Sequence, residues 1–170
     1  MSTHELGSLE LLHEALRRDG FSGDLVALVH LIGRTGFVDA EWALKELLVS
    51  EDGNLRWAAL TVLALEWTCK DQRQACERLA FLDPDPNEDV RRTAVAGLGA
   101  LLEGTRDAGA LKLLLPMVQD GRTRTDFRDT AYTAMRMIMG KGLGPIWEEL
   151  DWSKDIDWNL IEEAKAIAGT

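Results

Sequence analysis

The sequence has little of what strands and membrane spans are built from. Among its 170 residues there is one tyrosine, and no apolar run approaches the roughly 20 residues of a membrane-spanning helix. We find no sustained alternation of apolar and polar residues, which is the pattern of a half-buried strand. The N-terminus has no basic region followed by an apolar core, so no secretory signal is predicted.

Cysteine is also scarce. Cys69 and Cys76 are the only two cysteines in the chain, whereas small secreted domains that depend on disulfides carry many more. We therefore predict two buried free thiols and a cytoplasmic protein, because cytosolic thiols stay reduced.

Basic charge is outnumbered by acidic charge. The chain has 19 lysines and arginines against 29 aspartates and glutamates, a net charge of −10. Nucleic-acid binding needs a cationic face that releases counterions from phosphates, so this balance argues against a nucleic-acid partner and against an anionic membrane surface. It is compatible with a basic protein partner, which an acidic surface would attract over a distance.

Motifs for catalysis and cofactor binding are missing as well. The three histidines, His4, His13 and His30, have no second ligand at metal spacing, and there is no Cys-x-x-Cys pair. The glycine-rich segment Gly140–Gly144 does not follow a strand pattern, so it predicts a helix-breaking turn rather than a phosphate loop. We predict that the protein is not an enzyme and has no cofactor and no metal.

Helical periodicity is what the chain has in abundance, and it is clearest between Leu79 and Leu102. A helix pattern ends near Leu82, where Pro84 and Pro86 prevent its continuation. After cap residues at 87 and 89, a second helix pattern places its apolar residues on one stripe: Val90, Ala94, Val95, Leu98, Leu101 and Leu102. The whole chain predicts about ten such helices joined by short polar loops.

A short motif recurs at the start of several of these helices. It reads cap residue, apolar residue, arginine, two variable residues, alanine, and its full copies begin at Asn54, Asp89 and Asp126. Weaker starts at Asp24 and Asp157 lack the arginine, so the five starts are 30, 35, 37 and 31 residues apart. Helix pairs that recur at this spacing are typical of an α-solenoid.

The arginine of the motif is at an unfavourable position for a cation, because the N-terminal end of a helix carries partial positive charge. It is at Arg56, Arg91 and Arg128 in the three full copies. We predict that each side chain reaches a carboxylate in an adjacent loop or repeat and so holds the repeats together.

The segment Asp83-Pro84-Asp85-Pro86, followed by Val90–Val95 and Leu98-Gly99, resembles the HEAT repeat, in particular the short bacterial variety first noted in phycobilin lyase subunits. The other arginine-bearing copies extend this resemblance over roughly residues 50–140. It implies an all-α, right-handed α-solenoid of about four to five helix pairs without a sheet, forming one domain over 1–170. The expected parts are an N-terminal cap helix at 8–20, repeats near 24–49, 54–82, 88–118 and 126–150, and a C-terminal cap helix at 157–168.

The resemblance also implies that the second helix of each pair lines a concave face and that this face binds another macromolecule. Placing the predicted second helices in register gives six candidate contact residues: Trp42, Lys45, Arg73, Gln74, Glu77 and Lys112. Trp42 could equally pack under the N-terminal helix. The leading prediction is therefore a scaffold or adaptor that binds a protein partner on its second-helix face.

The C-terminal end offers a different candidate surface. Seven acidic residues and two lysines follow Ile146, a net charge of −5 and half that of the chain, and Trp152 lies among them. Aromatic and acidic residues together suit either a protein-binding rim or a cap on the last repeat. The alternative function is accordingly a small acidic inhibitor or immunity-type protein that neutralises a basic toxin or nuclease. A third reading is an enzyme or lyase subunit that acts on a bound chromophore or base.

Overall fold

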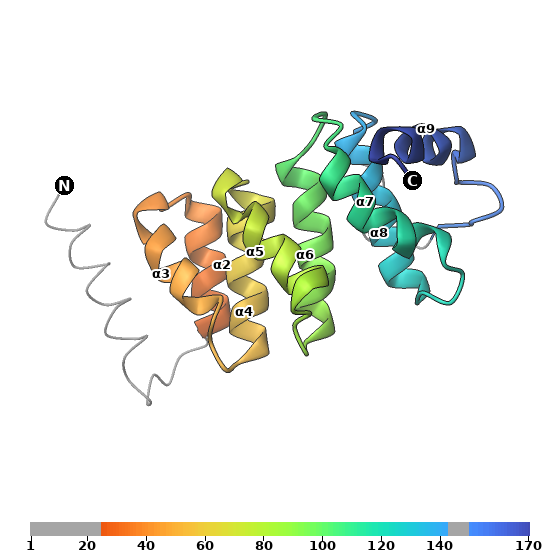
Figure 1. Cartoon of the computed structure of the whole chain (residues 1–170). Coiled ribbons are helices and arrows are strands. Elements are labelled where there is room, and N and C mark those ends of the chain that lie inside the picture. The colour runs from red at the N-terminus through yellow and green to blue at the C-terminus, as the bar shows by residue number, and fades with distance from the viewer. Residues whose placement is uncertain (1–24, 143–149) are drawn as a thin grey trace, which may run out of the picture.

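The computed structural model describes residues 25–142 and 150–170, and within these ranges the chain is entirely helical, without a strand (Figure 1). The helices stand side by side in a row from α2 at one end to α9 at the other (Figure 1). Their bounds are α2 Leu25–Thr35, η1 Val38–Ala40, α3 Glu41–Leu47, α4 Gly53–Leu60, η2 Thr61–Glu66, η3 Lys70–Gln72, α5 Arg73–Glu77, η4 Arg78–Leu82, α6 Glu88–Leu101, α7 Ala108–Gln119, α8 Thr125–Ile138 and α9 Trp158–Ala168.

The predicted all-α class is confirmed. Eight of the ten predicted helices correspond to α2 through α9. The other two, at 8–20 and near 145–150, lie wholly or largely outside the described residues. Within the described part of the chain, no helix has both the length and the apolar character needed to cross a membrane.

Along the chain the helices alternate between first helices (α2, α4, α6 and α8) and second helices (α3, α5 and α7). The first helices of successive pairs pack directly on one another, from α2 to α4 to α6 to α8, and each second helix packs against the first helix that follows it. Buried apolar side chains from every pair join into one continuous core. At the C-terminal end, α9 packs on α7.

Two helices, α4 and α8, begin two residues before their predicted starts, whereas α6 begins at a predicted cap. The side chains of Asp52 and Asn87 accept hydrogen bonds from backbone N–H groups at the starts of α4 and α6, which makes them the N-caps. The predicted cap Asn87 is therefore confirmed, while Asn54 and Asp89, which were also predicted as caps, lie inside the first turn. Asp126 likewise lies inside α8, whose N-cap residue makes no capping hydrogen bond with its side chain. The predicted cap at 157 is confirmed.

Two helices end in wide turns. Both α4 and α5 continue without a break into π-helical segments, η2 and η4. In η4 the backbone N–H of Asp83 donates to the carbonyl of Arg78 at 2.9 Å, and that of Asp85 donates to the carbonyl of Leu79 at 3.0 Å. By contrast α7 contains Pro116 and continues through it to Gln119. The wide turn of η4 fixes the start of the loop that carries the two prolines.

Glycine permits a close approach between α6 and its neighbouring helices. A Cβ atom added at Gly99 of α6 would lie 2.7 Å from the Cα of Ala134 in α8. One added at Gly97 would lie 2.9 Å from the Cβ of Ala64 and 3.0 Å from the Sγ of Cys76. Neither space can hold a methyl group, so the spacing between these helices depends on the absence of a side chain.

We expect Gly99→Ala to lower the free energy of unfolding by about 1–3 kcal/mol, because the added methyl group forces α6 and α8 apart. Urea unfolding followed by circular dichroism measures this change. Gly121→Ala is the control: a Cβ there meets nothing within 4 Å, so its effect should stay within about 0.5 kcal/mol. Equal effects of the two substitutions would contradict the close approach.

Candidate interaction surface

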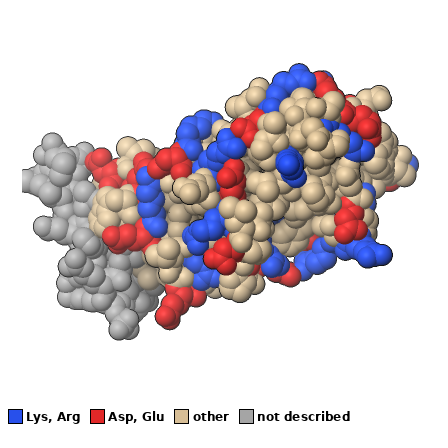
Figure 2. Space-filling view, viewed as in Figure 1, with Lys and Arg blue, Asp and Glu red and all other residues tan. Residues whose placement is uncertain are grey.

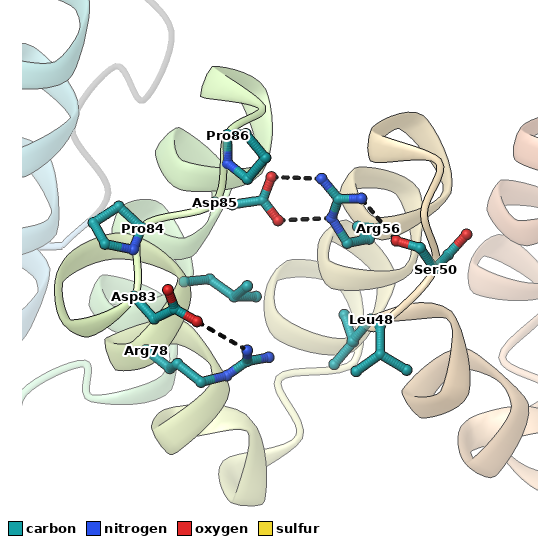
Figure 3. Close-up of a pocket in the computed structure, with 10 residues that line it drawn as sticks. Leu48, Ser50, Arg56, Arg78, Asp83, Pro84, Asp85 and Pro86 are labelled. Atoms are coloured by element: carbon teal, nitrogen blue, oxygen red, sulfur yellow. Dashed lines mark hydrogen bonds and ion pairs between the residues drawn. The ribbon is translucent and has the colours of Figure 1, made fainter.

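Arg56 is the most fully bonded of the three motif arginines. Its Nε and Nη2 donate to the two carboxylate oxygens of Asp85, each at 2.7 Å, and its Nη1 donates to the carbonyls of Ser50 and Glu51 at 2.7 and 2.9 Å (Figure 3). Only 11% of the Arg56 side chain and 4% of the Asp85 side chain are exposed. Arg56 thus joins the loop that enters its helix pair to the loop that leaves it, as the sequence predicted.

This pairing shifts the titration of Asp85. Burial alone would raise the pKa of the carboxyl, but hydrogen bonds from Arg56 and from the backbone N–H of Asn87 hold that pKa below its usual value. The hydrogen bonds that Arg56 donates to Asp85 raise the pKa of Arg56 above its usual value, although burial acts in the opposite direction. Both groups therefore stay charged in the native state around neutral pH.

The predicted carboxylate partner in an adjacent loop or repeat is wrong for Arg91. Its guanidinium lies 5.4 Å from the ring centroid of Phe127, and its ion pair, at 3.6 Å, is with Glu88 of its own helix. Asp85 lies six residues before the motif arginine Arg91, and the residue six before Arg128 is Arg122. The next loop therefore has an arginine at the position of Asp85. Ion pairs cross this joint in both directions: Arg124 pairs back to Glu88, and Arg92 pairs forward to Asp126 at 3.7 Å.

Arg128 also has a partner other than a carboxylate. Its Nε donates to the carbonyl of Val118 at 2.8 Å, and its guanidinium lies 3.4 Å from the ring centroid of Trp152. Trp152 in turn donates from Nε1 to the buried carboxylate of Asp129 at 2.6 Å. The predicted contact residue Trp152 is therefore half-buried and bonded within the chain. All three motif arginines contact a residue further along the chain, with different chemistry each time.

A second row of ion pairs connects the second helices. Lys45 of α3 contacts Glu41 at 2.5 Å and Asp71 at 2.6 Å. Arg73 of α5 donates to Glu77 at 2.8 Å and binds both oxygens of Asp107 at 2.8 and 3.0 Å. Hydrogen bonds that Lys45 donates to Asp71 and Glu41 raise the pKa of Lys45, while those that Arg73 donates to Asp107 lower the pKa of Asp107.

Three of the predicted contact residues, Lys45, Arg73 and Glu77, thus have their charges neutralised inside the chain. The other three second-helix candidates are exposed: Trp42 on α3, with 36% of its surface accessible, Gln74 on α5 and Lys112 on α7. On the side of the described part that Figure 2 shows, acidic and basic side chains are interspersed.

One group of metal-type ligands comes together that the sequence did not predict. Within the described residues, ligand atoms of Glu41, Cys69 and Asp71 all lie within 4.8 Å of one another. The ammonium of Lys45 contacts both of those carboxylates, so a cation is already present. Burial is the main cause that raises the pKa of the Cys69 thiol, and the negative charges of the two carboxylates add to it. Burial raises the pKa of Cys76 to about 12. Both cysteines are free, as predicted, but only Cys76 is fully buried.

A pocket of about 350 Å³ opens beside the Arg56–Asp85 ion pair (Figure 3). It lies between the two loops that Arg56 joins and the end of α5. Its lining residues are Leu48, Val49, Ser50, Arg56, Arg78, Leu79, Asp83, Pro84, Asp85 and Pro86.

No protein-family model matches this sequence, and no solved structure matches it. Among curated proteins, the chain is similar to the 26S proteasome regulatory subunit RPN2 of Eremothecium gossypii, with 24% identity over 130 residues. The match covers 76% of this chain and 14% of that protein, so the chain spans about one seventh of the length of the relative it matches.

We expect Asp85→Asn to lower the free energy of unfolding by about 3 kcal/mol, because it leaves the buried guanidinium of Arg56 without its counter-charge. Asp83→Asn is the matched control in the same loop. The Asp83 side chain is 83% exposed and lies 3.9 Å from Arg78, and such surface pairs contribute about 0–1 kcal/mol. A loss as small for Asp85→Asn as for Asp83→Asn would contradict the assigned role.

The stability of the native protein should fall in acid. Asp85 and Asp107 have lowered pKa values in the folded state, and unfolding returns them to about 3.9. Their stabilisation is therefore complete above about pH 4 and is lost as the pH falls through the lower native values. Urea unfolding across this pH range should show a shallower loss for Asp85→Asn than for the wild type. Parallel pH profiles would contradict this.

Proposed function

We propose that the chain is a non-enzymatic, HEAT-like helical repeat module that binds a protein partner on the face formed by α3, α5 and α7. The observation that carries this proposal is that some side chains of these second helices form ion pairs within the chain while others are exposed. Lys45 and Arg73 brace one helix to the start of the next, while Trp42, Gln74 and Lys112 remain at the surface. A braced surface loses little conformational freedom when a partner binds, which favours affinity.

Trp42 supplies the residue type that most often anchors such an interface. Tryptophan is enriched among interface residues whose truncation costs the most binding energy. Gln74 and Lys112 follow on the next two second helices and offer polar contacts around it. The three residues belong to three successive pairs, so the proposed contact face extends along the stack rather than around one loop.

The similarity to a regulatory subunit of the 26S proteasome supports a protein partner, since that relative is itself a subunit of an assembly. We further propose a cytoplasmic location, which the two free thiols support.

The alternative, an acidic inhibitor of a basic toxin or nuclease, would use the C-terminal end. Several of the acids there already have partners within the chain: Glu163 pairs with Arg106, Glu162 with Lys165, and Asp151 with Lys154. This leaves less unpaired negative charge to attract a basic protein, so we favour the second-helix face.

The test compares two triple variants of the full chain. We expect Trp42→Ala, Gln74→Ala and Lys112→Ala combined to weaken partner binding about tenfold or more, since each loss of 1.4 kcal/mol is a factor of ten. The control combines Asn54→Ala, Glu103→Ala and Lys141→Ala, which are exposed residues outside the second helices. Captured proteins from an extract of the source organism are quantified by mass spectrometry, and the dissociation constant is then measured with the purified partner.

Equal binding by the two triple variants, at unchanged unfolding free energies, would contradict the proposed face. The same purified complex separates the two functions. An association rate that falls steeply as salt is added would instead support the acidic inhibitor, because exposed charges are screened.

A further inference from the structure

The pocket beside Arg56 combines an apolar floor with a charged rim. Leu48 and Leu79 are buried and form the floor, whereas the charged Arg78 and Asp83 are exposed around it, together with Val49, Pro84 and Pro86. Figure 3 shows Leu48, Ser50 and Arg56 on one side of the opening and Arg78, Asp83 and Pro84 on the other. A volume of about 350 Å³ lies at the small end of the range for ligand sites, enough for one or two amino-acid residues.

Most polar groups that line the pocket are already satisfied. Arg56 makes four hydrogen bonds. Both oxygens of Asp85 accept from Arg56, and one also accepts from the backbone N–H of Asn87. The carbonyl and hydroxyl of Ser50 both accept hydrogen bonds within the chain. These groups define the walls and leave little capacity for a ligand.

Arg78 is different. Its side chain is 44% exposed, and the partner found for it among the described residues is Asp83, at 3.9 Å, beyond hydrogen-bond distance. A guanidinium has five N–H donors in a planar fork that fits a carboxylate at two points. Since Asp83 is well solvated, an incoming carboxylate displaces it at little cost.

The backbone holds Arg78 and Asp83 at this opening. Arg78 begins the π-helical segment η4, and the wide turn closes through the hydrogen bond from the Asp83 N–H to the Arg78 carbonyl. Pro84 and Pro86 then fix two φ angles in the loop. The opening is therefore formed before any ligand binds.

We propose that this pocket binds a carboxylate next to an aliphatic side chain on the protein partner, with the carboxylate on Arg78 and the aliphatic group against Leu48 and Leu79. This inference rests on the proposed function, because the ligand belongs to a protein. Either an acidic side chain or a C-terminal carboxylate supplies this chemistry. The pocket lies where α3 and η4 end, and so at the edge of the second-helix face.

The test titrates the isotope-labelled full chain with three probe peptides and follows the NMR signals of Val49, Asp83 and the Arg78 Nε–H. The first is N-acetyl-Ala-Ala-Leu with a free carboxylate, the second is its carboxamide, and the third is an amidated peptide with an internal Leu-Glu pair. Binding of the first but not the second assigns a chain terminus. Binding of the third assigns an acidic side chain. Absence of binding by both carboxylate probes overturns the proposal.

Two substitutions in the pocket should act in opposite directions. Arg78→Gln should weaken binding of the carboxylate probe about tenfold or more, since it removes a charged hydrogen-bond donor. Asp83→Asn should tighten it about two- to fivefold, since it removes the internal competitor. Arg122→Gln, an exposed arginine in the next inter-pair loop, is the control and should change nothing.

Weaker binding by Asp83→Asn, or binding that survives Arg78→Gln unchanged, overturns the pocket assignment. Peptide binding does not require the natural partner, so this result is independent of the triple-variant experiment. Loss of partner binding by the second-helix variant without any peptide binding would refute the pocket alone. Peptide binding without any effect of the second-helix variant would refute the proposed face alone.

Discussion

The ion pair between Arg56 and Asp85 is the interaction on which the arrangement of the first pairs depends. A bidentate guanidinium–carboxylate contact fixes direction as well as distance, and here it joins the loops at both ends of one helix pair. Both groups are removed from solvent, so either one alone would be costly to bury. The pocket is a consequence of this geometry, since the two loops that Arg56 brings together form its walls.

The same position is used differently along the stack. Where the sequence places Asp85 in one loop it places Arg122 in the next, and Arg91 accordingly lies against Phe127 while exposed pairs such as Arg124 with Glu88 carry charge across the joint. Exposed pairs contribute less than buried ones. At this later joint, α6 and α8 approach each other closely at Gly99. This apolar contact takes the place of the buried ion pair of the earlier joint.

Periodicity was sufficient to predict the helices, because the spacing of apolar residues determines which stripe of each helix is buried. The motif also predicted a carboxylate partner for Arg56. It did not predict that Lys45 and Arg73 brace the second helices, since Asp71 and Asp107 lie 26 and 34 residues further along the chain and helical spacing says nothing about such distant pairs. The pocket was missed for the same reason: its walls come from two loops that only stacking brings together.

A double-mutant cycle on Arg56 and Asp85 tests the central claim, that these two side chains act as one brace between loops. Unfolding free energies are measured for the wild type, Arg56→Gln, Asp85→Asn and the double variant. We predict a coupling energy of about 2 kcal/mol, with the double variant little less stable than either single one. Additive losses, with coupling below about 0.5 kcal/mol, would show that the two residues act independently and would contradict the account.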